Sequence, residues 1–232
     1  MPLTHVAHLK LLDLPADTTE LSGIPTPGLL EIFHDLTTYG DVDDLGSSAW
    51  LVRWTPAEDG AEMEALDAAP PVDPPLDLDP DHTIPAVACQ ADLAPTIPSP
   101  LDLGDVDEET WERYDRVHDL LERNMYLRNA LFAPGVDHGD SPWGVRQVTL
   151  EPMSRLGGYG YNERNSDYEA ILHEVLPLVG GDHHVMLADI IPATFTDADW
   201  FHGQRHLQIW IRASDLEARR FDCTWSFIRT DG

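Results

Sequence analysis

Metal binding is the chemistry that the side chains of this sequence could support most directly, because histidines and aspartates gather between residues 182 and 206. The group comprises His183, His184, His202 and His206, together with Asp182, Asp197 and Asp199. Neutral imidazoles with a carboxylate form a zinc-type ligand set, and three protein ligands beside an open position form a catalytic arrangement. His202 and His206 are four residues apart, which would place both on one face of a helix or of a strand.

Two features argue against a metal ion at this group. The sequence contains no His-Glu-x-x-His motif, and the spacing of the histidines crosses the boundary of an internal repeat. We therefore favour surface or strand-pairing roles for the four histidines. We expect neither a bound metal nor any other cofactor.

Motifs for nucleophilic catalysis and for phosphate binding are missing from the sequence. There is no Gly-x-Ser-x-Gly, and Cys223 stands at the start of a predicted strand, where a small core residue is more common than a reactive thiolate. Gly157-Gly-Tyr-Gly160 lacks the following Lys-Ser/Thr of a phosphate loop and predicts a turn. The catalytic residues stay unknown, and the sequence points away from an enzyme while leaving catalysis open.

Arg219 and Arg220 are candidate binding residues, because a guanidinium group pairs with a carboxylate through two hydrogen bonds. The favoured interpretation of the pair is structural. One arginine would pair with Asp222 or Asp215 and fix a short helix to the last strand, because cations gather near helix C-termini for local reasons. The alternative is a clamp for an anion or a carboxylate.

The seven tryptophans divide into predicted core and predicted surface residues. Trp143 and Trp200 lie in predicted loops and are the candidates for exposed binding anchors, because loop tryptophans are enriched at binding surfaces. Four others, Trp50, Trp54, Trp210 and Trp225, lie in predicted strands and are expected in the core.

Three amphipathic segments are predicted helices. The first covers 108–131, with apolar residues at spacings of three, four and seven, and Asp105 with Glu108 would cap its N-terminus. The second covers about 167–176. The third begins at Ser214 with a Ser-x-x-Glu pattern, which is typical of a helix start.

Seven short apolar runs predict strands: Val6–Leu12, Leu29–His34, Trp50–Trp54, Val145–Leu150, Val185–Ile191, His206–Ile211 and Thr224–Ile228. They do not alternate regularly with helices. We therefore predict an α+β fold with mostly antiparallel sheet and two or three packed helices.

An internal repeat links these strands. Residues 8–54 and residues 184–229 each follow the order strand, long loop, strand, crossover, strand. A three-stranded unit cannot bury a face alone, so two copies would share one core. In the second copy, apolar residues alternate with Gln and Arg, which predicts one buried face and one solvent-facing face.

The acidity of the chain is concentrated in its first half. The whole sequence holds 14 basic and 42 acidic residues, a net charge of −28, and residues 1–112 alone carry −22. Residues of about 57–107 form an acidic, proline-rich connection, which we expect to be a solvated surface segment within a single domain of 1–232. The alternative is an acidic patch that docks a basic partner.

This charge makes nucleic acid and membrane surfaces poor partners, because both are anionic. No apolar run approaches the roughly 18 residues of a membrane span, and no export signal is visible. Cys89 and Cys223 are too few for a disulfide framework. We therefore expect a cytoplasmic protein with reduced thiols.

Several blocks resemble the YwqG-like family, a bacterial domain of unknown function. They are Asp215-Leu-Glu-Ala-Arg-Arg-Phe-Asp222 before Trp225, Leu187-Ala-Asp-Ile-Ile191, Leu207–Arg212, Gly157-Gly-Tyr159, Pro27–Phe33 and Trp50–Trp54. The resemblance spans nearly the whole chain and implies a duplicated α+β fold. It implies no reaction. The family's Trp-Gly-Asp approach to its last strands is replaced here by Trp200-Phe-His-Gly-Gln-Arg205.

Two classes of function are compatible with these features. The favoured one is a non-catalytic protein-binding module that engages a basic protein, as an immunity protein or antitoxin engages a toxin. The alternative is an enzyme, metal-assisted through His183, His184, His202 and His206, with its site between the two repeats.

Overall fold

The computed structural model describes residues 3–11, 14, 23–35, 38–43, 49–57, 106–132, 154–158, 167–191 and 205–230. Its strands are β1 (Thr4–Lys10), β2 (Gly28–His34), β3 (Trp50–Pro56), β4 (Arg155–Leu156), β5 (His184–Ile190), β6 (Arg205–Arg212) and β7 (Trp225–Thr230). Its helices are α2 (Glu108–Phe132), α3 (Asp167–Val175), α4 (Ala213–Glu217) and the 3₁₀ turn η4 (Phe221–Cys223).

The strands form two antiparallel sheets, which confirms the predicted α+β class. Sheet A has the order β1-β2-β3, and sheet B has the order β4-β5-β6-β7. Six of the seven predicted strands are present with ends that shift by one or two residues. The remaining one, Val145–Leu150, lies outside the described residues, as does nearly all of the predicted acidic connection at about 57–107.

The two sheets share one hydrophobic core. In sheet A the buried side chains alternate along β2, at Leu30 and Ile32, and in sheet B along β6, at Leu207, Ile209 and Ile211. This alternation follows from the period of two in a strand, which places every second side chain on one face. Each fully buried aliphatic side chain contributes roughly 1.5–3 kcal/mol, so neither sheet would be stable without the other.

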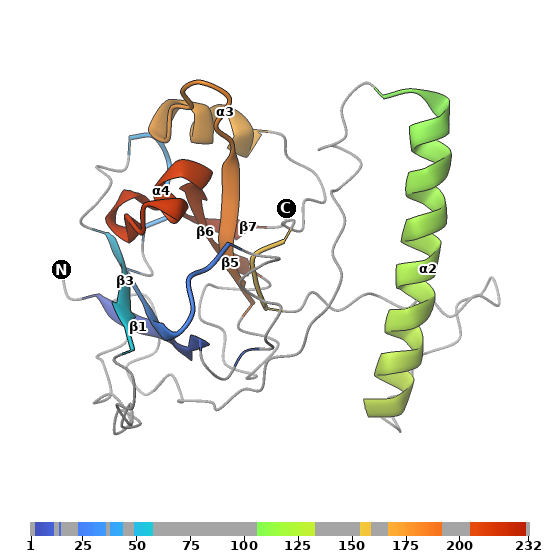
Figure 1. Ribbon diagram of the computed structural model, residues 1–232, viewed down its shortest axis with the longest axis horizontal. Coiled ribbons are helices and arrows are strands. Elements are labelled where there is room, and N and C mark those ends of the chain that lie inside the picture. The colour runs from blue at the N-terminus through green and yellow to red at the C-terminus, as the bar shows by residue number, and fades with distance from the viewer. Residues whose placement is uncertain are drawn as a thin grey trace.

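Helix α3 covers the opposite face of sheet B. Leu172 and Leu176 pack with Met186, Trp210 and Phe227 in a second buried cluster. Strand β6 is therefore buried on both faces, and the prediction that one of its faces meets solvent is wrong. Figure 1 shows α3 and α4 gathered about the sheets, with α2 standing to one side.

The sheets are joined by two tryptophans that stand at the starts of β3 and β7. Trp50 Nε1 donates to the carbonyl oxygen of Thr224 (3.1 Å), and Trp225 Nε1 donates to that of Gly40 (2.9 Å). Their rings meet edge to face with centroids 4.8 Å apart. Each half of the chain thus satisfies an indole of the other, although the duplication that would relate them stays a prediction.

Three of the four predicted core tryptophans belong to the two clusters or pack against them. The fourth, Trp50, packs against the rings of His34 and Trp225. Trp50 and Trp210 are buried, whereas Trp54 and Trp225 are half-buried at the edges of the core. This agrees with the amphipathic character of an indole, which buries its ring and satisfies its N–H.

The N-terminus of α2 is capped differently from the prediction. The backbone N–H of Thr110 donates to Asp107 Oδ1 (2.8 Å), so Asp107 is the capping residue rather than Asp105. Hydrogen bonds from the side chain and from the backbone of Thr110 hold the pKa of Asp107 below its ordinary value. Among the described helices, none is both long enough and apolar enough to cross a bilayer.

His34 is a fully buried histidine at the end of β2. Its ring stacks on that of Trp50, with centroids 6.0 Å apart and planes 12° apart. Burial lowers the pKa of His34 to about 4, an effect that Asp35 only partly opposes. The ring is therefore neutral at neutral pH.

Replacing Gly40 by alanine should destabilise the protein by about 3 kcal/mol or more. Gly40 has a φ of 87°, and an added Cβ would lie 1.9 Å from the carbonyl oxygen of Ser226. Gly180 is the matched control, since its φ of 65° is also positive but its added Cβ meets nothing within 4 Å. Gly180→Ala should cost only the backbone strain of about 1–2 kcal/mol. Equal losses in urea melts of the two variants would contradict the close approach at Gly40.

His34 should make stability fall in mild acid. Because its folded pKa of about 4 lies below the unfolded value of 6.5, the stabilisation is complete above the unfolded pKa and is lost as pH falls toward the folded one. From about pH 7 to about pH 5 this group alone should cost about 2 kcal/mol. His34→Gln cannot titrate, so urea melts at both pH values should show a smaller loss in the variant. Identical losses would show that His34 is not the group responsible.

Candidate functional site

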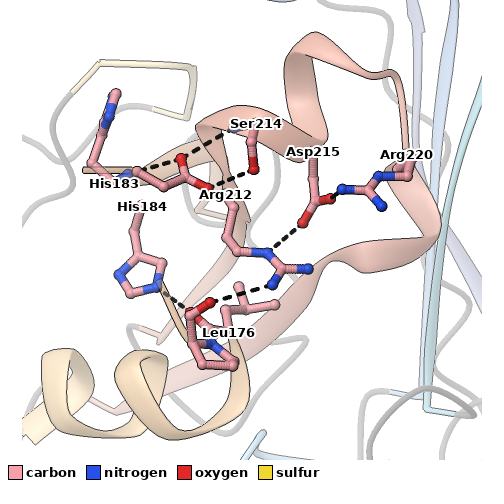
Figure 2. Close-up of polar contacts among 9 residues, drawn as sticks. Leu176, His183, His184, Arg212, Ser214, Asp215 and Arg220 are labelled. Atoms are coloured by element: carbon pink, nitrogen blue, oxygen red, sulfur yellow. Dashed lines mark hydrogen bonds and ion pairs between the residues drawn. The ribbon is translucent and has the colours of Figure 1, made fainter. Parts of the chain in front are cut away.

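An open depression of about 540 Å³ lies where the end of β6 meets α4 and the turn before β5. Its lining mixes polar and apolar surface in nearly equal parts and includes both signs of charge. It comprises Pro177, Val179, Gly180, Gly181, Asp182, His183, Arg212, Ala213, Ser214, Glu217 and Arg220. Figure 2 shows the polar contacts that hold this region together.

Asp215 is a buried residue whose carboxylate pairs with two arginines that line the depression. Its side chain is fully buried, and Arg212 Nε donates to its Oδ2 at 2.5 Å. Arg220 forms an ion pair with its Oδ1. The hydrogen bond from Arg212 to Asp215 raises the pKa of Arg212. A buried carboxylate needs such compensation, because leaving it unpaired would cost several kcal/mol.

The positions of Arg219 and Arg220 are fixed by the hydrogen bonds at the C-terminus of α4. The N–H of Arg219 donates to the carbonyl of Leu216 (3.0 Å) and that of Arg220 to the carbonyl of Asp215 (2.8 Å), which is the Schellman arrangement. Arg219 occupies the left-handed position, with φ 58°, where glycine is usual. The chain therefore reverses between the two arginines.

Arg219 and Arg220 consequently have different partners. Arg219 lies over the ring of Trp54, with its guanidinium carbon 4.8 Å from the centroid, and so binds the helix end to β3 of sheet A. Arg220 turns to Asp215. Of the two partners predicted for an arginine here, the structure selects Asp215, whereas Asp222 is exposed.

Asp182 organises the other side of the depression. Its carboxylate accepts hydrogen bonds from the Ser214 hydroxyl (2.5 Å) and from the backbone N–H groups of Ser214 (3.2 Å) and His183 (2.9 Å). The Ser214 hydrogen bond is the main reason why the pKa of Asp182 is lowered. The predicted Ser-x-x-Glu cap is thus wrong, since no side chain within α4 caps its N-terminus and Asp182, in the turn before β5, accepts the Ser214 N–H instead.

The four histidines predicted as the best metal group are not brought together as a set. In the antiparallel ladder His184 pairs with Arg212, while His206 lies just beyond the pair of Ile190 with Leu207. About six residues of extended strand, roughly 20 Å, separate the two along the ladder. His202 lies outside the described residues.

Each described member of that group has a local role. His184 is half-buried, with Nε2 at 2.8 Å from the carbonyl oxygen of Leu176, and burial is the main cause of its lowered pKa. His183 is exposed on the rim of the depression. His206 is buried, with Nδ1 at 3.1 Å from Asp189 Oδ1.

Asp189 begins a buried polar chain that the sequence interpretation missed. Gln208 Nε2 donates to Asp189 Oδ2 (3.4 Å), and Trp210 Nε1 donates to Gln208 Oε1 (3.3 Å). Arg155 Nε lies 3.9 Å from the same carboxylate. No signal in the sequence distinguishes this buried polar row from a solvent-facing one, because polar residues at alternate strand positions ordinarily indicate a face that meets water.

The described arrangement can hold an anionic group, because Arg220 keeps more than half of its side chain exposed beside the depression. Arg212 is more deeply placed and also donates to the carbonyl of Pro177 (3.3 Å). Trp143 and Trp200, the predicted exposed anchors, lie outside the described residues and stay predictions.

Comparison with known proteins gives one match. The family model described as a domain of unknown function (DUF1963) matches residues 1–228. No curated protein and no solved structure matches the chain.

Replacing Asp215 by alanine should lower the free energy of unfolding by about 3 kcal/mol, because it leaves the partly buried Arg212 charge without its partner. The exposure of Arg220 limits the loss, since water can solvate that charge. Asp222 provides the matched control. Because it is exposed, Asp222→Ala should stay within about 0.5 kcal/mol of the wild type. Denaturant melts of both variants check this, and a larger loss for Asp222→Ala would restore the pairing predicted for that residue.

Proposed function

This chain belongs to the DUF1963 family of unknown function, and we propose that it is a non-catalytic protein-binding module that engages a basic partner. Within that family we propose the YwqG-like type, on the residue blocks that carry the resemblance. The proposed class is that of immunity proteins and antitoxins, which neutralise a basic toxin by binding it.

The form of the depression is the observation that carries this proposal. Small-molecule sites are usually enclosed and mostly apolar, with few polar groups. This depression is open, and its polar groups are largely engaged with one another, through Asp215 on one side and Asp182 on the other. A rigid, open surface of mixed polar and apolar character matches the rim of a protein interface better than an enclosed substrate pocket.

The charge of the chain supports a basic partner. A net charge of −28 would accelerate association with a cationic protein and disfavour nucleic acid and anionic membrane surfaces. Helix α2 contributes exposed carboxylates at Glu108, Glu112 and Asp119. We place the interaction in the cytoplasm, where Cys223, a free cysteine in the structure, would stay reduced.

Within the depression, mixed charges would set the orientation of the partner. Glu217 and Asp182 offer carboxylates to a basic surface, while Arg220 offers donors to an acidic group of the same partner. Val179, which is 79% exposed on the rim, is the apolar contact that such an interface would bury.

The test is affinity capture from a lysate of the source organism, followed by titration of the purified partner. We expect a partner with a pI above about 9, released by roughly 0.5 M NaCl because salt screens the attraction. Val179→Arg should weaken binding at least tenfold, about 1.4 kcal/mol, through lost apolar contact and charge repulsion. Val42→Arg is the matched control, since Val42 is also exposed but lies outside the depression.

Binding that is equally strong in Val179→Arg and in the wild type would rule out the depression as the interface. Capture of an acidic partner alone would rule out the charge argument. Both variants alter exposed side chains, so neither should change the melting temperature by more than a few degrees.

The alternative proposal is an enzyme, metal-assisted in one form, with its site between the two predicted repeats. The contact between Asp189 and His206 favours it, since a buried carboxylate at Nδ1 fixes the orientation of an imidazole ring. An activity found by substrate screening and lost in His206→Gln with the fold intact would favour this alternative over the binding module.

A further inference from the structure

Sheet A carries a cluster of His5, His8 and Glu31 on the face opposite to its core residues. In a regular strand, residues three apart point to opposite faces. The register of β1 on β2 shifts between His5 and Ala7, so that His5 pairs with Phe33 and His8 pairs with Glu31. Since Phe33 and Glu31 are two apart in β2, this bulge brings both histidines to the face that Glu31 occupies.

The ligand atoms of the cluster are close together. One ring nitrogen of each histidine and one carboxylate oxygen of Glu31 all lie within 4.8 Å of one another. Around a tetrahedral zinc ion with bonds of about 2.0–2.1 Å, ligand atoms are about 3.4 Å apart. Inward movements of roughly 1 Å, within the reach of side-chain rotation, would close the set around an ion.

The histidine nitrogens are removed from solvent without compensation. His5 Nε2 and both ring nitrogens of His8 are buried and have no hydrogen-bond partner among the described residues. Buried polar atoms nearly always have a partner, and an unpaired one costs free energy. A bound cation would satisfy one nitrogen of each ring, because a neutral imidazole nitrogen is the commonest metal ligand in proteins.

Glu31 is oriented by a second residue, Arg53. Arg53 Nε donates to Glu31 Oε2 at 2.8 Å, and its Nη2 lies 2.6 Å from the same oxygen. Both contacts fall on Oε2, so Oε1 takes no part in them and can serve as a metal ligand. Outer partners of this kind fix the orientation of metal-binding carboxylates.

We propose that His5, His8 and Glu31 bind one divalent first-row metal ion, of which zinc fits the ligand set best. Two imidazoles and one carboxylate form a set that zinc uses in proteins, and three protein ligands leave at least one coordination position for water or another ligand.

This site was invisible to sequence inspection for a physical reason. His5 and His8 have a spacing that matches neither one face of a regular strand nor a His-Glu-x-x-His helix. The bulge that aligns them, and the pairing with Glu31 some 23 residues later, exist only once β1 and β2 have paired.

The test uses the full chain without an affinity tag. Titration of metal-free protein with Zn²⁺ in a calorimeter should give one equivalent bound, and Co²⁺ should give the visible absorption bands of a four-coordinate site. His8→Ala and Glu31→Gln should each weaken binding at least tenfold. Arg53→Gln, which removes only the outer partner, should weaken binding by about 10-fold or more while the stoichiometry is retained.

His118→Ala is the matched control, since His118 lies on α2 outside the cluster, and it should bind Zn²⁺ like the wild type. Circular dichroism of the metal-free variants shows whether each is folded. Glu31→Gln, which keeps the shape of the side chain, decides the matter if His8→Ala does not fold. Binding well below one equivalent in the wild type, or unchanged binding in Glu31→Gln, would overturn the proposal.

Discussion

The burial of one carboxylate, that of Asp215, constrains the C-terminal part of this structure. A fully buried charge must be compensated, and here two guanidinium groups compensate it, from Arg212 at the end of β6 and from Arg220 after α4. The short helix between them must then end abruptly, in the left-handed turn at Arg219. That turn sends Phe221 into the core and brings Trp225 to the edge of Trp50.

The same turn connects the two sheets. Arg219 rests on Trp54 of β3, and Phe221 stacks near the same indole, with ring centroids 6.2 Å apart. With the reciprocal hydrogen bonds of Trp50 and Trp225, these contacts join halves of the chain that are about 170 residues apart. Both arginines of this block therefore have structural roles, Arg219 on Trp54 and Arg220 on Asp215. Arg220 also keeps more than half of its side chain exposed beside the depression.

The candidate sites differ in how they relate to this framework. The depression lies at the turn before β5, the end of β6 and α4. Its polar groups are held in place by hydrogen bonds to Asp215 and Asp182. The histidine–glutamate cluster belongs to sheet A alone and depends on a bulge in β1. A binding module that docks a partner at the depression could therefore carry a metal on its other sheet without conflict between the two roles.

The local sequence pattern determined which segments of this protein form strands and helices. Tertiary packing decided which residues of those segments contact one another. Alternation of apolar residues was sufficient to predict β2, β3 and β6, because the period of a strand is a local property. The second buried face of β6 was missed, since its burial depends on the packing of α3 against Trp210 and on the contacts of Gln208 with Asp189 and Trp210. The cap of α2 was misplaced by two residues, because several acidic residues near a helix start can serve and geometry selects one. Chain reversal after α4 pairs Arg220 with Asp215. Strand register keeps His184 apart from His206 and brings His5 and His8 to the same face. These are relations between distant residues, which an isolated sequence pattern does not contain.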